Sequence, residues 1–120
     1  MTKILVADDD KVMLGLLTTL MELEGNDVVT VTRPEQIVPT VEQEKPELIL
    51  MDYHLSGGTS LEALKELKST AQFEDVPVVV TSGMDRQTEC LRAGATDFIL
   101  KPFRPKELLE RILNILEEEA

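Results

Sequence analysis

The sequence predicts an α/β protein built on one doubly wound parallel sheet. Along its 120 residues, short apolar runs alternate five times with segments of helical period. The run at residues 48–51 (LILM) has no polar alternation, which is typical of a strand buried on both faces of a parallel sheet. Polar side chains follow these runs directly, where open α/β sheets place their sites. Right-handed crossovers then put helices on both faces of the sheet.

The first strand and helix are predicted at the N-terminus. Residues 4–7 (ILVA) form an apolar run, and from residue 11 apolar residues recur every three or four positions, which predicts a helix. Asp10 is suited to cap its start and Gly25 to follow its end. The wide apolar face of this helix is expected to include Val12, Met13, Leu16, Leu17, Leu20, Met21 and Leu23.

The second strand and helix carry a conflict between pattern and proline. Residues 27–32 (DVVTVT) are rich in β-branched side chains and alternate with polar ones, which predicts an edge strand. A helix opens near Pro34, a residue that the first helical turn tolerates. Pro39 removes a backbone donor and clashes with the preceding turn, so we expect a kink or a late start. The central strand then ends in Asp52.

The second half continues the alternation without repeats or linkers, so residues 1–120 are expected to form a single domain. Glycines 57 and 58 mark a predicted loop. The further predictions are a loop at 53–59, a helix at 60–71, a strand at 76–82, a short polar helix at 85–93, a strand at 97–101 and a final amphipathic helix carrying Leu108, Leu109, Ile112, Ile115 and Leu116.

Composition excludes several classes. Hydrophobic residues make up 42% of the chain, too many for a disordered protein, and no apolar run is long enough to cross a membrane. A net charge of −11 disfavours direct nucleic-acid binding because it repels phosphate. Residues 1–3 lead straight into a strand, so no signal peptide is expected. The single cysteine cannot form an internal disulfide, which favours a reducing, cytoplasmic location.

Side chains able to bind ions follow four of the five predicted strands: Asp8, Asp9, Asp52, Thr81 or Ser82, and Lys101. If the first strand lies beside the third, three carboxylates converge, and they require a compensating cation to stay ionised. Oxygen ligands suit Mg²⁺. A lysine and a hydroxyl would bind the oxygens of an anion such as a phosphoryl group, toward which a carboxylate can act as nucleophile. The same crowding predicts that removing Asp9 stabilises the chain without metal. Turn or helix capping by Asp8, Asp10 or Asp52 is the simpler alternative.

Five segments, in this order, carry a resemblance to a known family: 4–9 (ILVADD), 48–52 (LILMD), 77–82 (PVVVTS), 93–95 (AGA) and 101–103 (KPF). They resemble the receiver domain of bacterial two-component response regulators, over essentially the whole chain. The resemblance implies a flavodoxin-like sheet of order 2-1-3-4-5. It also implies a signalling switch that catalyses its own aspartyl phosphorylation and dephosphorylation and is not a metabolic enzyme.

The resemblance implies partners as well. The phosphoryl donor would be a sensor histidine kinase or a histidine phosphotransfer protein. The receiver of the signal would be an output domain, a downstream protein or a second copy of the chain bound after phosphorylation. The strongest alternative is a pseudo-receiver that acts only as a protein-interaction module, but such domains tend to lose acidic or lysine positions, and all are present here. A flavodoxin-type protein is disfavoured because three aspartates would repel its cofactor's phosphate.

The resemblance assigns the metal site and the acceptor. Asp52 matches the phosphoryl acceptor. Asp9 and Asp52 would ligate Mg²⁺ directly together with the backbone carbonyl of His54, and Asp8 would act mainly through a bound water. The side chain of His54 is expected to be an exposed loop residue without a catalytic role. A phosphatase of the dehalogenase type would instead need an acid at position 54.

The remaining roles concern the switch. Lys101 would contact the phosphoryl oxygens and precede a cis peptide bond to Pro102. Neighbouring strand residues face opposite ways, so only one of Thr81 and Ser82 can reach the phosphoryl group. The family's spacing, counted from Pro77, implies that this residue is Ser82. Phe98 matches the aromatic switch position, although a plain core role is equally open. As a switch it would turn inward on phosphorylation.

Three features depart from the family's pattern. Ser56 stands where a proline is usual, four residues after the acceptor. Ser60 stands where a glycine usually begins the third helix. The segment between Ser82 and Ala93 is shorter than usual. These departures leave the chemical residues in place, but they concern the stiffness of the loop after Asp52 and the shape of the fourth helix.

Overall fold

The computed structural model describes residues 2–119, and its elements follow the predicted alternation. In chain order they are β1 (Lys3–Ala7), α1 (Lys11–Leu23), β2 (Asp27–Val31), the 3₁₀ helix η1 (Pro34–Gln36), α2 (Ile37–Glu44), β3 (Leu48–Asp52), β4 (His54–Leu55), β5 (Gly58–Thr59), α3 (Leu61–Lys68), β6 (Val78–Ser82), α4 (Gln87–Arg92), β7 (Asp97–Leu100) and α5 (Pro105–Glu119).

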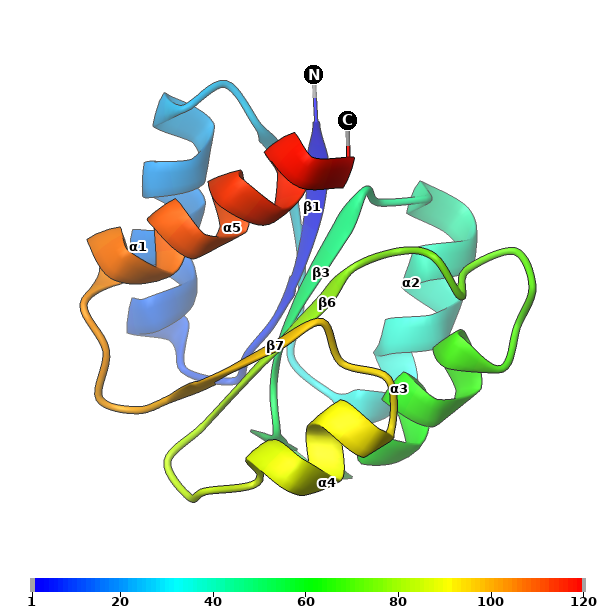
Figure 1. The fold of residues 1–120 in the computed structure, drawn as a ribbon. Coiled ribbons are helices and arrows are strands. Elements are labelled where there is room, and N and C mark those ends of the chain that lie inside the picture. Colours follow the sequence, from blue (N-terminus) through cyan, green and yellow to red (C-terminus); the bar gives the residue numbers. More distant parts are fainter. Residues whose placement is uncertain (1, 120) are drawn as a thin grey trace.

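The main sheet has five parallel strands in the order β2-β1-β3-β6-β7. Because β4 and β5 pair only with each other, this order is the expected 2-1-3-4-5 of the five major strands. Helices α1 and α5 cover one face, and α2, α3 and α4 cover the other (Figure 1). The fold prediction is therefore confirmed. Within the described residues, no helix combines the length and the apolarity that crossing a bilayer requires.

Each face of the sheet has its own apolar core, and the alternation along β3 shows how they divide. Ile49 and Met51 pack into the core under α2, α3 and α4, whereas Leu48 and Leu50 pack under α1 and α5. All five residues of β3 are buried, as are all five of β6. Burial on both faces explains why these strands lack polar alternation.

Helix α1 corrects the predicted apolar face. Leu14, Leu17 and Met21 are its buried residues, and their spacing of three and four follows one stripe of the helix. Val12 and Leu23 are instead 82% and 78% exposed, because positions 12 and 23 lie on the side turned away from the sheet. The terminal signals are confirmed. Asp10 accepts hydrogen bonds from the amides of residues 12 and 13, and residue 25 has a φ of +87°.

The second helix begins late, as Pro39 predicted. A 3₁₀ turn comes first, and α2 begins at Ile37, which makes Pro39 its third residue. The missing proline N–H therefore falls among the first four amides, which have no partner inside a helix. Two other predictions need correction. The segment 53–59 is a small hairpin and not a simple loop, and helices α3 and α4 are shorter than predicted.

Candidate functional site

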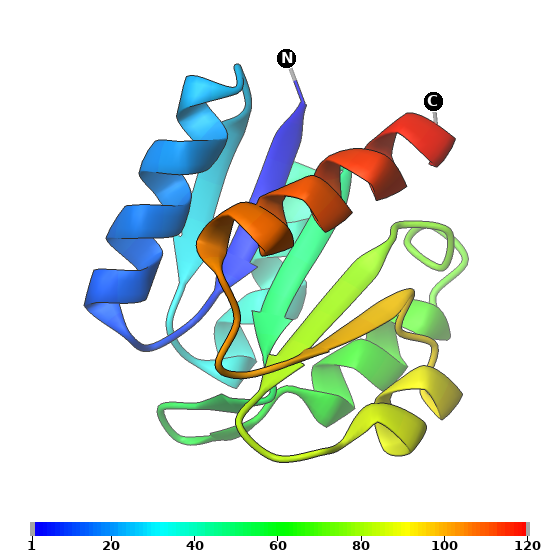
Figure 2. The same cartoon turned by 60° about the vertical axis from the view of Figure 1, so that its left-hand side comes forward.

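The predicted site residues meet at the carboxyl ends of the central strands. Strands β1 and β3 pair in parallel with Ala7 opposite Met51. The next residues, Asp8 and Asp52, therefore lie side by side at the ends of these two strands. The β4–β5 hairpin lies at this same end of the sheet (Figure 2). Strand order thus brings together two aspartates that are 44 positions apart in sequence. The predicted carboxylate cluster required the first strand to lie beside the third, and it does.

Three carboxylates form a cluster at this edge. Asp8, Asp9 and Asp52 each offer one oxygen, and these oxygens lie within 4.8 Å of one another. Asp8 and Asp52 are only 4% and 8% exposed, whereas Asp9 is exposed. Negative charges this close repel one another and favour a bound cation. The donor set consists of hard oxygen ligands, which fits Mg²⁺.

The pKa of Asp8 is raised, mainly because the carboxyl is buried. Burial raises the pKa of this carboxyl, and the charges of Asp52 and Asp9 raise it further. A hydrogen bond from the Asp10 amide, 2.9 Å from Asp8 Oδ1, and the charge of Lys101 oppose the rise without cancelling it. The folded chain therefore holds one carboxylate that is costly to keep ionised, which is the condition that a divalent cation relieves.

Lys101 closes the cluster from the far edge of the sheet. Its Nζ donates a hydrogen bond to Asp52 Oδ2 at 2.9 Å and lies 4.0 Å from Asp8 Oδ2. Partial burial lowers the lysine pKa, but the bond to Asp52 and the nearby aspartate charges outweigh it, so the pKa is raised. The ammonium is therefore held charged beside the acceptor candidate. The peptide bond from Lys101 to Pro102 is cis, as the resemblance implied.

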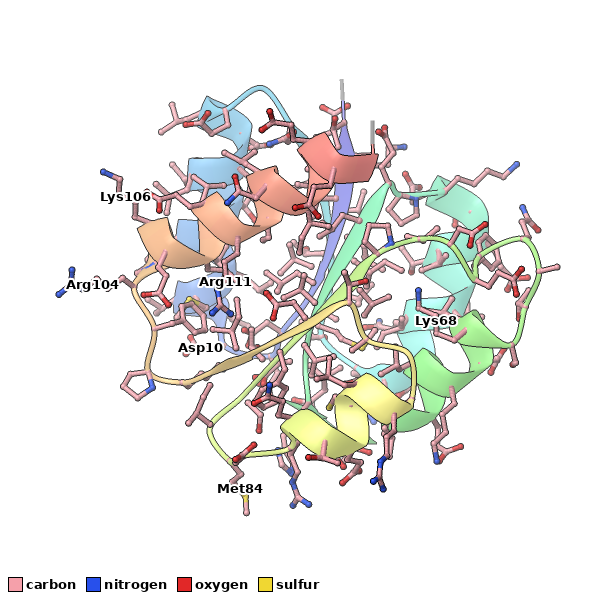
Figure 3. The ribbon with its side chains drawn as sticks, viewed as in Figure 1. Asp10, Lys68, Met84, Arg104, Lys106 and Arg111 are labelled. Carbon is pink, nitrogen blue, oxygen red and sulfur yellow. The ribbon has the colours of Figure 1, made fainter. Side chains whose placement is uncertain are left out.

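The two candidate hydroxyls end strand β6. Thr81 is the ladder partner of Asp52, and Ser82 is the last residue of the strand, fully buried. The oxygen of Ser82 accepts a 3.1 Å hydrogen bond from the amide of Met84, which leaves its proton available to another acceptor. Met84 itself extends away from the body of the protein (Figure 3). The preference for Ser82 over Thr81 stays a prediction.

Phe98 lies in the core and not on the surface. The ring is 7% exposed and belongs to the apolar cluster under α2, α3 and α4. It is therefore already packed inward in this conformation, so a further inward turn would remove little apolar area from water. The buried ring is what a core role predicts. A role for Phe98 in the switch stays a prediction.

The loop after Asp52 is closed by contacts that the sequence did not reveal. The hydroxyl of Ser60 donates to the backbone carbonyl of Asp52 at 2.9 Å, and its amide donates to the carbonyl of Tyr53, also at 2.9 Å. The hydroxyl of Ser56 donates to Asp9 Oδ2 at 3.3 Å. The signal available in the sequence was that serines 56 and 60 depart from the family pattern. The side chain of His54 is exposed as expected, and a role for its carbonyl stays a prediction.

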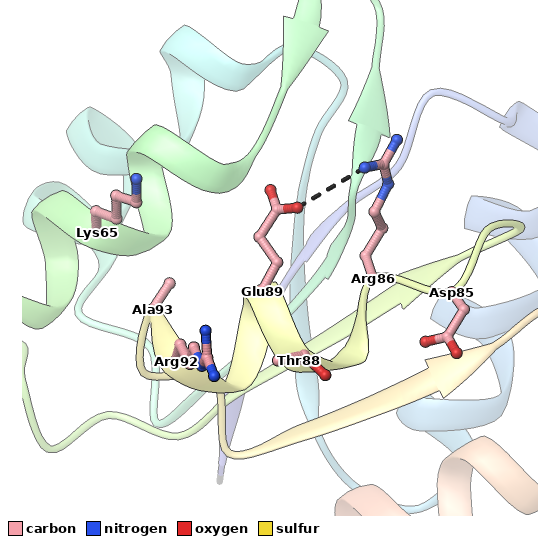
Figure 4. Close-up of a pocket in the computed structure, with 7 residues that line it drawn as sticks. All are labelled: Lys65, Asp85, Arg86, Thr88, Glu89, Arg92 and Ala93. Carbon is pink, nitrogen blue, oxygen red and sulfur yellow. Dashed lines mark ion pairs between the residues drawn. The ribbon is translucent and has the colours of Figure 1, made fainter.

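Tyr53 connects the end of β3 to helix α4. Its hydroxyl donates a 2.6 Å hydrogen bond to Glu89 Oε1, and the guanidinium of Arg86 lies 5.3 Å from the centre of its ring. Arg86 also pairs with Glu89 at 3.7 Å (Figure 4). The pocket drawn there, between α3 and α4, shares no lining residue with the carboxylate cluster.

Comparisons with known proteins agree with this geometry. The model of the response regulator receiver domain matches residues 4–113. The chain is 33% identical over 117 residues to the phosphate regulon transcriptional regulatory protein PhoB of Klebsiella pneumoniae, which covers 95% of this chain and 51% of that protein. It is 30% identical over 119 residues to protein PilH of Pseudomonas aeruginosa, which covers 97% and 98% of the two chains.

A solved structure is similar as well. The receiver domain of sensor histidine kinase PA1611 from Pseudomonas aeruginosa, with a magnesium ion coordinated in its active site cleft, has a TM-score of 0.85 at 25% identity and covers 97% of this chain and 98% of that chain. The chain spans about half the length of PhoB and nearly all of PilH. Because the family model covers most of the sequence and the sheet order agrees, the chain belongs to the response regulator receiver domain family of two-component systems.

Proposed function

We propose that this receiver domain accepts a phosphoryl group on Asp52 and that its phosphorylation state controls a partner-binding surface. The observation that carries the proposal is the pairing of Asp52 with Lys101 at 2.9 Å inside a cluster of three carboxylates. Receiver domains interact with histidine kinases and output domains. The donor proposed here is accordingly a phosphohistidine on a sensor kinase or a phosphotransfer protein, and the proposed location is the cytoplasm.

The chemistry is a displacement at phosphorus. An Asp52 carboxylate oxygen attacks the phosphorus, the nitrogen–phosphorus bond of the phosphohistidine breaks, and its electron pair returns to the imidazole ring. Asp52 then carries an acyl phosphate, which attack by water returns to carboxylate and inorganic phosphate. The Lys101 ammonium would contact the phosphoryl oxygens and offset their negative charge. The hydroxyl of Ser82 would donate a hydrogen bond to one of these oxygens.

Asp8, Asp9 and Asp52, with the carbonyl of His54, are the residues that would hold Mg²⁺. When bound, the ion would offset the negative charge of the carboxylates and of the incoming phosphoryl oxygens. The magnesium in the cleft of the PA1611 receiver domain supports this assignment for a protein of the same fold. The raised pKa of Asp8 supports it from this chain itself.

The output surface proposed here comprises α4, β7 and α5. Two large apolar side chains are exposed on it, with Leu91 41% and Leu100 50% accessible. Arg111 of α5 forms an ion pair with Asp97 of β7 at 3.4 Å. A rearrangement of these two elements would have to keep or break this pair. A downstream protein, an output domain or a second copy of the chain would bind there after phosphorylation.

The test is phosphorylation by a small phosphodonor with Mg²⁺, read by intact-protein mass. The wild type should gain one acid-labile phosphoryl group. Asp52→Asn should gain none, because an amide is not a competent nucleophile. Asp75→Asn, which changes an exposed carboxylate in the loop before β6, should behave as wild type. Labelling of the Asp52 variant at the wild-type level would move the acceptor elsewhere. A folded wild type that accepts no phosphoryl group and ignores beryllofluoride would favour the pseudo-receiver alternative.

A further inference from the structure

The turn that follows the acceptor strand has an unused place for proline. Ser56 and Gly57 are the two residues between β4 and β5, whose ladder pairs Leu55 with Gly58. Gly57 has a φ of +94°, whereas the φ of Ser56 is not positive. A positive φ at the second central residue alone is the pattern of a type II turn, in which proline is common at the first. Position 56 therefore suits a residue that stiffens the turn, yet it holds a hydroxyl.

That hydroxyl reaches across to the loop after β1. It donates to Asp9 Oδ2 at 3.3 Å, joining two segments that are 47 positions apart. In the part of the chain that the structure describes, Ser56 is the one side chain that donates to the Asp9 carboxylate. The hydroxyl of Ser56 is therefore the side-chain donor that orients the Asp9 carboxylate.

The other two carboxylates of the cluster are held differently. Asp52 and Asp8 are both buried, the first bonded to Lys101 and the second to the amide of Asp10. Asp9 is exposed. Without its bond to Ser56, the Asp9 side chain would be free to sample other rotamers in water, and a ligand must lose that freedom when it binds a cation.

The turn itself is held in place, which makes Ser56 a defined anchor. A side chain on Gly57 would meet the guanidinium of Arg33, with Nη2 only 2.5 Å from the position of a Cβ. Arg33 therefore lies against the turn from the side of β2. Beyond the hairpin, Ser60 fixes the strand end through the carbonyl of Asp52 at 2.9 Å. The serine hydroxyl thus projects from a hairpin that Ser60 ties to the end of β3 and that the Arg33 side chain flanks at its turn.

We propose that Ser56 is a positioning residue that orients Asp9 for Mg²⁺, at the expense of the stiffer turn that a proline would give. The proposal rests on the proposed function, in which Asp9 is a metal ligand. In this role the Ser56 hydroxyl would keep its bond to Asp9 Oδ2 while the carboxylate ligates the ion. Loss of an outer hydrogen-bond partner of a metal ligand typically weakens metal binding by about 10- to 100-fold. Because this bond is long and exposed, we expect about 3- to 10-fold, at or below the lower end of that range.

Three variants of the full chain separate the hydroxyl from the turn. Ser56→Ala removes the hydroxyl. Ser56→Pro also removes it but suits the turn. Ser56→Thr retains it. The matched control is Ser69→Ala, which removes an exposed hydroxyl that bonds to a backbone carbonyl at the end of α3. Magnesium affinity is measured from the fluorescence of Tyr53, in a chain with one tyrosine and no tryptophan, and from the amide shifts of residues 9 and 52.

The expected result is a weaker magnesium affinity for Ser56→Ala and Ser56→Pro, by about 3- to 10-fold, with Ser56→Thr and the control near wild type. With a small phosphodonor, the first two variants should need more Mg²⁺ for half-maximal phosphorylation and reach the wild-type rate at saturation. Wild-type affinity in Ser56→Ala or Ser56→Pro would overturn the proposal, as would equal losses in the alanine and threonine variants. A wild type that binds no Mg²⁺ would overturn the proposed function together with this inference.

Discussion

The ammonium of Lys101 donates a 2.9 Å hydrogen bond to Asp52 Oδ2, although the two residues are 49 positions apart in the chain. The carboxylate is buried and the lysine side chain is 28% exposed. The proposed acceptor is thus already paired with the ammonium group that would bind the phosphoryl oxygens after phosphorylation. This pair joins the central strand to the end of β7 and makes the site depend on the complete sheet.

Removing the lysine should cost stability before any phosphorylation. Lys101→Met leaves the buried Asp52 carboxylate without its partner, and a hydrogen bond to a charged group contributes about 1.5–3 kcal/mol. We expect the free energy of unfolding in denaturant to fall by about that amount at neutral pH. Lys106→Met, which changes an exposed lysine at the start of α5 (Figure 3), is the control. Equal stability of the two variants would show that the pair adds nothing to folding.

Neutralising Asp8 should have the opposite effect. Its pKa is raised by burial in the folded chain, so the folded state binds the proton more tightly and stability falls as the pH rises through the raised pKa. Asp8→Asn should therefore be more stable than wild type at neutral pH in a chelating buffer. The difference should shrink as the pH falls below the ordinary carboxyl range. Thermal unfolding across this pH series measures it, and a less stable variant at neutral pH would contradict it.

Because Asp8 is buried and Asp9 is exposed, Asp8 is the carboxylate whose removal should stabilise the metal-free chain. The sequence suggested that removing Asp9 would stabilise the chain, but Asp9 is exposed and carries the bond to Ser56. Repulsion between exposed charges is screened by solvent. In the same chelating buffer, Asp9→Asn should change the free energy of unfolding less than Asp8→Asn does. A larger change for Asp9→Asn than for Asp8→Asn would show that Asp9 is the more strained carboxylate.

The phenol of Tyr53 should titrate above its ordinary range. Its hydrogen bond to Glu89 raises the pKa, and burial and the glutamate charge act in the same direction. Glu89→Gln should lower the pKa toward that of a free tyrosine, because an uncharged partner no longer opposes the phenolate. Alkaline titration by ultraviolet absorbance reports this one tyrosine directly. Glu62→Gln, on the exposed side of α3, should leave the curve unchanged.

The hydroxyl at the end of β6 should decide the response to phosphorylation. Ser82→Ala should take up beryllofluoride but show a reduced pattern of distant amide shifts, because it lacks the proton that would bond the new oxygens. Thr81→Val should keep the wild-type pattern. If Thr81→Val loses the response and Ser82→Ala keeps it, then Thr81, the ladder partner of Asp52, is the contact.

Phe98 should be tested for its two roles separately. Phe98→Ala should lower the free energy of unfolding by about 3–5 kcal/mol, since it empties a buried aromatic site. Phe98→Leu keeps most of the apolar volume and should cost less. If the ring also serves the switch, both variants should accept a phosphoryl group at Asp52 yet lose amide shifts in α4 and α5. Wild-type shifts in the leucine variant would leave Phe98 with a core role alone.

The sequence by itself determined the strands and their ends. Runs such as 48–51 have to be buried on both faces, because nothing in them can face water, and the aspartates that follow have to appear at the carboxyl edge. The cap at Asp10 and the late start forced by Pro39 are local effects, which the residues themselves specify. The strand order came from the resemblance to the family, because the spacing of apolar residues does not indicate which strands are neighbours.

Only the tertiary structure decided which side chains meet. The apolar period of α1 allowed several faces, and packing against the sheet buried Leu14 while leaving Val12 exposed. Likewise, burial separates Asp8 from its neighbour Asp9, although both follow the same strand. The bond from Ser56 to Asp9 joins loops that only the order of the strands brings together. Such contacts depend on where two distant segments lie in space, and local periodicity carries no information about that.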